Sequence, residues 1–174
     1  MGNAIVSLIL VALMITTGLG FSKVAINSAD ELSQSWKDAQ RANLDQRRTN
    51  FSLVRADANA GIVNVYLENS GQLQLDSYQD WDIIAQYYDQ NGAYTIKSLY
   101  YMPGTMAEPN KWTVYSIYSS QALSGPEVFQ PRIVDPGEVA ELQIKLAPAP
   151  GPGRMGWIII SSGNGLTGSI QFQG

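Results

Sequence analysis

The chain has 174 residues, 11 basic and 15 acidic side chains, and no cysteine or histidine. Its net charge of −4 argues against nucleic acid as a partner, because phosphate contacts need a basic surface. Without cysteine or histidine there is no disulfide, no thiolate nucleophile and no usual general base at neutral pH. We therefore expect a protein that is not an enzyme and that holds no cofactor.

The first element is an apolar stretch, Ala4 to Phe21, that contains no charged side chain. Its 18 residues are long enough to cross most of a hydrocarbon core as a helix. Nothing basic precedes the stretch, as it would in a secretory signal. Two interpretations stay open: an uncleaved membrane anchor, or the start of a mature chain whose short basic leader has been removed.

Residues 3 to about 47 are predicted to form one continuous helix, because residues 23–47 contain neither Gly nor Pro. In the second half, small and apolar residues recur at intervals of four, three, four and three, which gives a narrow stripe. The stripe is expected to pack under the chain's own globular domain or between subunits. It consists of Ala25, Ala29, Leu32, Trp36 and Ala39.

After the helix the periodicity changes to two, and short strands alternate with Gly, Pro and Asn turns. Eight or nine strands with no second helix predict an antiparallel immunoglobulin-like β-sandwich. The fold class is thus α+β, with a helix over residues 1–48 and a sandwich over 49–174. Asn50 begins an Asn-Phe-Ser triplet, a candidate N-glycosylation site if the chain leaves the cytoplasm.

Two side-chain groups in the sandwich region are weaker candidates for ligand binding. Asp80 and Asp82, with Asp76 or Asp89, have the oxygen ligands that Ca²⁺ prefers, although such residues more commonly form a solvated face. Seven tyrosines between Tyr87 and Tyr118 suit either a glycan-binding surface or, more commonly, core and subunit contacts.

Three stretches together resemble an archaellin, the flagellin of archaea. They are GNAIVSLILVALMITTGLGF (2–21), GIVNVYLENSGQLQLDSY (61–78) and IVDPGEVAELQIKL (133–146). The Asn-x-Gly and Pro-Gly-Glu turns in the last two also recur in archaeal pilins and archaellum stator proteins. Two positions bear on whether the chain is closer to an archaellin or to a pilin. Ile5 lacks the Glu usual in bacterial type IV pilins, and Met1 stands where archaellins usually begin with a small residue.

The resemblance implies a structural subunit of a motility filament, a helical homopolymer on the cell surface that is turned by a motor at its base. Before assembly the subunit would be inserted in the membrane. Within the polymer the apolar helices would form the core and the sandwiches the surface. The alternative is an adhesion pilus subunit or an archaellum stator protein. The residues expected to pack in the core are Ile5, Val6, Leu8, Ile9, Ala12, Leu13, Met14, Ile15, Gly18, Leu19, Gly20 and Phe21.

Overall fold

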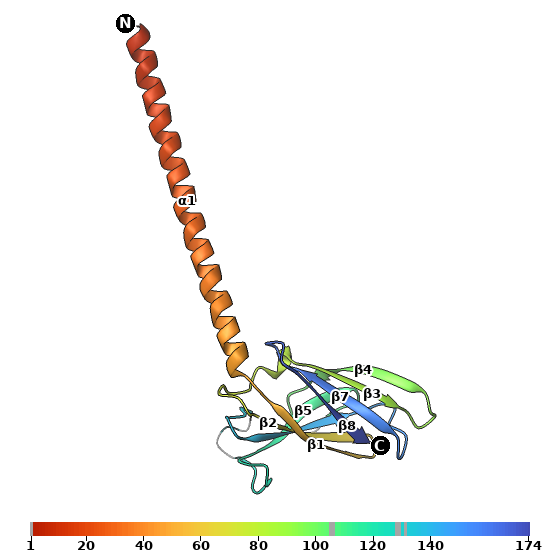
Figure 1. The fold of residues 1–174 in the computed structure, drawn as a ribbon. Helices are drawn as coiled ribbons and strands as arrows, with labels where there is room; N and C mark the ends of the chain where they lie inside the picture. Colours follow the sequence, from red (N-terminus) through yellow and green to blue (C-terminus); the bar gives the residue numbers. More distant parts are fainter. Residues whose placement is uncertain (1, 105–106, 128–129, 131) are drawn as a thin grey trace. The chain divides into compact units, whose positions relative to one another are not determined.

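The computed structural model describes the backbone of residues 2–104, 107–127, 130 and 132–174, and omits the side chains of 2–4, 19–22 and 24–26. The chain forms two compact units, Met1–Asn43 and Leu44–Gly174, which are described separately here. The N-terminal element is the helix α1 (Gly2–Arg48), drawn in red to orange in Figure 1. At 1.5 Å per residue its 47 residues extend about 70 Å. Within the described residues, no helix combines the length and the apolar character needed to cross a membrane.

The C-terminal unit is a single eight-stranded sheet that folds over on itself, so the α+β class is confirmed. The strand order is β1-β2-β6-β5-β4-β3-β7-β8, and the two end strands, β1 and β8, also lie close together. The sheet is therefore a nearly closed sandwich. Its strands are β1 (Ser52–Asn59), β2 (Ile62–Glu68), β3 (Asp82–Tyr88), β4 (Tyr94–Tyr101), β5 (Lys111–Tyr118), β6 (Val139–Lys145), β7 (Met155–Ser161) and β8 (Thr167–Gln173).

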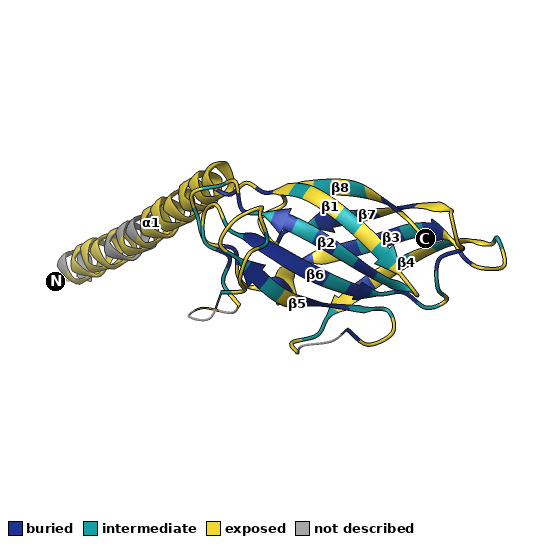
Figure 2. Ribbon diagram, turned by 90° about the horizontal axis from the view of Figure 1, so that it is seen from below, coloured by how far each residue is buried: buried dark blue, intermediate teal, exposed yellow. Residues whose placement is uncertain are grey.

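The alternating pattern read from the sequence is visible in the burial of these strands. In β2, Val63, Val65 and Leu67 face the core, while the residues between them are partly exposed (Figure 2). The core joins aliphatic side chains of both layers to an aromatic group in which Trp112 packs against Tyr78 and Tyr101. Burial of this apolar surface holds the two layers together.

Three expectations about the sandwich are wrong in detail. The prediction of purely antiparallel pairing fails at β4 and β5, which pair in parallel over two residue pairs where the chain crosses from one layer to the other. The segment Leu73–Ser77, which the sequence also predicts to be a strand, forms none, because only Leu75 makes a bridge, to Val134. The expectation of no second helix fails as well, since a short 3-10 helix, η1 (Tyr78–Asp80), follows that segment.

Candidate functional site

The apolar half of α1 is the largest group of candidate residues, and its described side chains are strongly exposed. Exposure of the large apolar residues between positions 5 and 15 lies between 53% and 73%. Covering each of them would contribute about 1.5–3 kcal/mol. This surface needs a partner outside its own unit. The residues are Ile5, Val6, Leu8, Ile9, Leu10, Val11, Leu13, Met14 and Ile15.

Small residues of the same helix leave room for a neighbour. Ala12 and Gly18 are exposed, and a Cβ added at Gly18 would meet nothing within 4 Å. Small residues of this kind allow helix backbones to approach closely. Three further predicted core residues, Leu19, Gly20 and Phe21, have side chains outside the described ones.

Two threonines in the apolar half satisfy their hydroxyl groups within the helix itself. The Thr16 hydroxyl donates to the Ala12 and Leu13 carbonyls at 3.1 and 3.0 Å. The Thr17 hydroxyl donates to the Leu13 and Met14 carbonyls at 2.7 and 3.1 Å. Hydroxyls of Ser and Thr commonly return to the helix backbone in this way. These two threonines therefore add no unsatisfied donor to the apolar surface.

The stripe in the second half of α1 is also solvent-exposed. Leu32 is 60% and Trp36 is 71% exposed, and Ala29 and Ala39 are exposed as well. The Ala25 side chain lies outside the described ones. What the stripe packs against stays a prediction.

Asn50 lies on the short connection between α1 and β1, with an exposed side chain. Its neighbours Thr49 and Phe51 are buried, and Phe51 stacks on Trp81 at 5.7 Å between ring centroids. A turn holds the segment in place, since the Gln72 amide donates to the Arg48 carbonyl at 2.8 Å. The asparagine of the triplet is thus presented on an ordered connection, accessible to modification.

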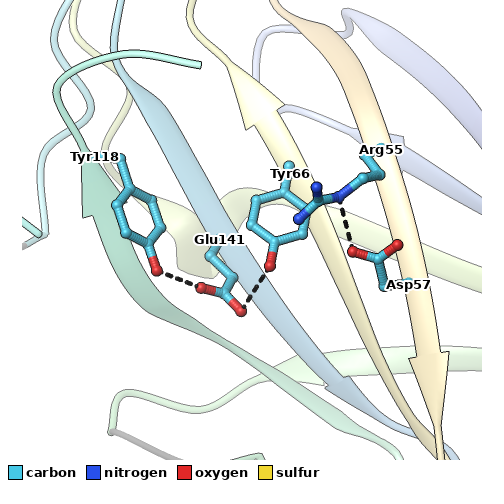
Figure 3. Close-up of polar contacts among 5 residues, drawn as sticks. All are labelled: Arg55, Asp57, Tyr66, Tyr118 and Glu141. Carbon is cyan, nitrogen blue, oxygen red and sulfur yellow. Dashed lines mark hydrogen bonds and ion pairs between the residues drawn. The ribbon is translucent and has the colours of Figure 1, made fainter. Parts of the chain in front are cut away.

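Residues that sequence reasoning missed form a polar network on the outer side of β1, β2, β6 and β5 (Figure 3). Glu141 is almost fully buried and accepts hydrogen bonds from the hydroxyls of Tyr118 at 2.8 Å and Tyr66 at 3.2 Å. The Arg55 guanidinium lies 4.3 Å from the centre of the Tyr66 ring and pairs with Asp57 at 2.7 Å. The alternation of each strand places these residues outward, but the sequence does not reveal which strands are neighbours.

The electrostatics of this network follow from burial and from the carboxylate. Burial raises the pKa of Tyr118, and the hydrogen bond and negative charge of Glu141 raise it further. The pKa of Tyr66 is also raised, chiefly by burial. The network therefore links the outer side of four neighbouring strands, β1, β2, β6 and β5.

The acidic residues considered for Ca²⁺ are not arranged as the sequence suggested. Asp80 belongs to η1 and not to a strand, so it does not share a strand face with Asp82. Asp89 caps the β3–β4 turn, because its carboxylate accepts from the Asn91 and Ala93 amides at 2.9 and 2.8 Å. Asp76 and Asp80 line an open cavity of about 280 Å³. Among the described residues, no three His, Cys, Asp or Glu side chains could hold a metal ion together.

A comparison with protein families shows to which family the chain belongs. A model of the archaeal-type flagellin family matches residues 3–172. The chain belongs to the archaeal-type flagellin family. The match covers residues 3–21 of the first stretch and all of the other two on which the resemblance to archaellins rested, so that interpretation is confirmed. Archaeal-type flagellins are structural filament subunits.

Solved structures share the fold of this flagellin at low sequence identity. The archaeal flagellum of Methanospirillum hungatei strain JF1 is 14% identical, with a TM-score of 0.55, and the match covers 95% of this chain and 88% of that one. The archaellum periplasmic stator protein complex FlaF and FlaG from Sulfolobus acidocaldarius is 22% identical, with a TM-score of 0.50, covering 70% and 87% respectively. No curated protein is significantly similar to the chain.

Proposed function

We propose that this flagellin polymerises into an archaellum filament that drives swimming. Residues 1–48 pack as the filament core and residues 49–174 form the surface. Membership of the archaeal-type flagellin family over residues 3–172 is the observation that carries the proposal. The filament has an extracellular location, and its partners are identical subunits together with the motor and assembly machinery at its base.

The exposed apolar half of α1 supports the assignment of the helix to the filament core and of the sandwich to its surface. A soluble domain does not leave side chains such as Leu8, 73% exposed, and Met14, 72% exposed, in contact with water without a partner. Equivalent helices from other copies provide such a partner, because their surfaces are chemically alike. A repeated head-to-tail contact that does not close into a ring generates a helical filament.

Before assembly, the same stretch is proposed to hold the subunit in the membrane. The uncharged run from Ala4 to Phe21 supports this step. When a subunit moves from the membrane into the filament, its apolar helix exchanges contact with lipid for contact with similar helices, and both environments are apolar. Side-chain packing between helices therefore decides whether the subunit stays in the membrane or assembles. Cell fractionation tests the step: unassembled subunits should sediment with membranes and resist alkaline extraction. Recovery in the soluble fraction would contradict it.

The substitution Leu8→Arg tests the filament core. It places a charge where neighbouring helices should pack, and the exposed position lets the isolated subunit fold unchanged. Cells producing this variant should lack surface filaments under the electron microscope and should not spread in soft agar. The control Ser124→Arg adds the same charge at an exposed loop position and should leave both unchanged. Normal filaments built from Leu8→Arg subunits would refute the proposed core.

The adhesion pilus and the stator protein remain the alternatives to be separated by experiment. Mass spectrometry of sheared surface filaments should identify this chain as their main component. A deletion strain should lose swimming while it still attaches to surfaces. Loss of attachment with normal swimming would favour the adhesion pilus. Loss of swimming with intact filaments that do not contain the chain would favour the stator.

A further inference from the structure

The outer side of β3, β4 and β7 carries an exposed group of aromatic and aliphatic side chains. Its six large members are between 38% and 71% exposed. They project from three neighbouring strands, since β3 pairs with both β4 and β7. We call this group the aromatic face; it consists of Tyr88, Tyr94, Ile96, Tyr100, Met155 and Trp157.

Strand register makes the aromatic face continuous. Tyr88 is paired with Tyr94, and their rings lie 5.2 Å apart. Gln86 is paired with Ile96 on one side and with Trp157 on the other, so these residues form a row across three strands. Exposed apolar patches of several hundred Å² are uncommon on monomeric proteins and mark interaction surfaces.

The aromatic face also carries very little charge. Among the outward positions of these described strands, the one charged side chain is Asp82, at the first residue of β3. At the other end of the face, the guanidinium of Arg154, the residue before β7, lies 5.7 Å from the centre of the Tyr88 ring. The outer side of the other layer instead carries the charged side chains of Arg55, Asp57 and Glu141. Two copies of a chain with net charge −4 repel each other over most of their surfaces. A face with its few charges at the edges is where like copies can approach, and interface centres are depleted in charge.

The size of the face indicates how it is used. Three strands of about seven residues cover on the order of 300–400 Å². A stable pair of free proteins needs about 800 Å² from each partner. The face is too small to hold two free subunits together. The face is large enough to form a contact between two subunits that are already joined elsewhere, because tethering raises the effective concentration of one surface near the other.

We propose that the aromatic face is the lateral contact between the β-units of neighbouring subunits in the filament, closed after the helices have assembled. This inference rests on the proposed function. The surface it meets on the next copy is a different one, because a helical polymer uses head-to-tail contacts.

Two measurements on the full chain test the proposal. In hydroxyl-radical footprinting, Tyr94, Tyr100 and Trp157 should react less in filaments than in subunits held in mild detergent. Tyr115, 47% exposed on β5, is the control and should react equally in both. Equal reactivity of the aromatic face in the two states would overturn the proposal. So would protection that disappears when glycans are removed from intact filaments, because carbohydrate would then be the cover.

The second measurement uses charge. Ile96→Glu should still assemble through α1, but the concentration of unassembled subunit should rise about tenfold or more, because burial of an isoleucine is lost. The matched control is Val54→Glu, at a position that is 45% exposed on β1. Filaments of Ile96→Glu that match the Val54→Glu control would overturn the lateral contact while leaving the filament itself established. Failure of the unsubstituted chain to polymerise would instead refute the proposed function.

Discussion

Asn69 is bonded to Val134, which lies 65 positions further along the chain: its side-chain amide donates a 2.8 Å hydrogen bond to the Val134 carbonyl. The same amide donates to the Leu73 carbonyl at 2.8 Å, and the side-chain oxygen accepts from the Gly71 amide. The Gly137 amide donates to the Asn69 carbonyl at 2.8 Å. This fully buried asparagine therefore connects the Asn-x-Gly turn to the Pro-Gly-Glu turn.

Replacing Asn69 should therefore destabilise the C-terminal unit strongly. Asn69→Ala removes the side-chain donor to the Leu73 carbonyl, one of the two donors to the Val134 carbonyl, and the acceptor of the Gly71 amide. Because the site is buried, we expect a loss of about 2–4 kcal/mol. Thermal unfolding followed by circular dichroism measures the loss. Asn91→Ala, at an exposed turn position, is the control and should change stability by less than about 0.5 kcal/mol. Equal unfolding midpoints for the two variants would show that the connection is not needed.

The network around Glu141 predicts loss of stability in alkali. The raised pKa values of Tyr66 and Tyr118 mean that the folded state favours the neutral, hydrogen-bonding phenols. Their contribution is therefore fully present below about pH 10, the pKa of an unfolded tyrosine, and is lost as the pH rises through the higher folded values.

Tyr118→Phe isolates one of these hydrogen bonds. The variant should be less stable than the unsubstituted chain by about 1 kcal/mol at pH 8, and the difference should shrink as the pH approaches 12. Thermal unfolding midpoints between these two pH values provide the measurement. Tyr115→Phe removes an exposed hydroxyl and serves as the control. A difference that stays constant over this range would argue against titration of Tyr118.

Gly156 in β7 is predicted to tolerate no side chain. A Cβ there would lie 2.5 Å from the Phe172 ring and 2.9 Å from the Tyr87 Cβ, and both residues are buried. Gly156→Ala should therefore cost about 1–3 kcal/mol through overpacking. Gly104→Ala is the matched control, because its Cβ would meet nothing within 4 Å. Urea unfolding of the two variants measures the difference in their free energies of unfolding.

Asn50 is predicted to carry a glycan in the native filament. Its exposed side chain on the connection between α1 and β1 makes it accessible. Mass spectrometry of the peptide containing Asn50 should show a mass increase that disappears in Asn50→Gln. Asn59→Gln, at an exposed position outside any such triplet, should leave the mass increase in place. An unmodified Asn50 in purified filaments would remove the site from consideration.

The alternation of apolar and polar residues was sufficient to predict the positions of the strands. In β2, for example, Val63, Val65 and Leu67 face the core and alternate with partly exposed residues, as a period of two requires. Contacts that depend on neighbours far apart in sequence were not predictable. The segment around Leu75 looked like a strand, but the hydrogen bonds of Asn69 and the left-handed conformation of Ser77 shape it instead.

The candidate site shows the same limit. The apolar composition of residues 4–21 identifies the surface that needs a partner, because composition does not depend on tertiary contacts. The aromatic face and the Glu141 network depend on which strands lie side by side, as β2 and β6 do at Tyr66 and Glu141. Pairing of this kind is decided by packing of the whole sandwich, and no local pattern encodes it.

The internal bonding of Thr16 and Thr17 has a practical consequence for handling the polymer. Because Thr16 and Thr17 satisfy their hydroxyl groups within the helix, neither demands a hydrogen bond from a neighbouring copy, and apolar contact is what this part of the helix offers its neighbours. Mild non-ionic surfactants, which replace such contacts, should release intact subunits at concentrations that leave the β-unit folded. Concentrated salt, which screens charges, should leave the polymer whole.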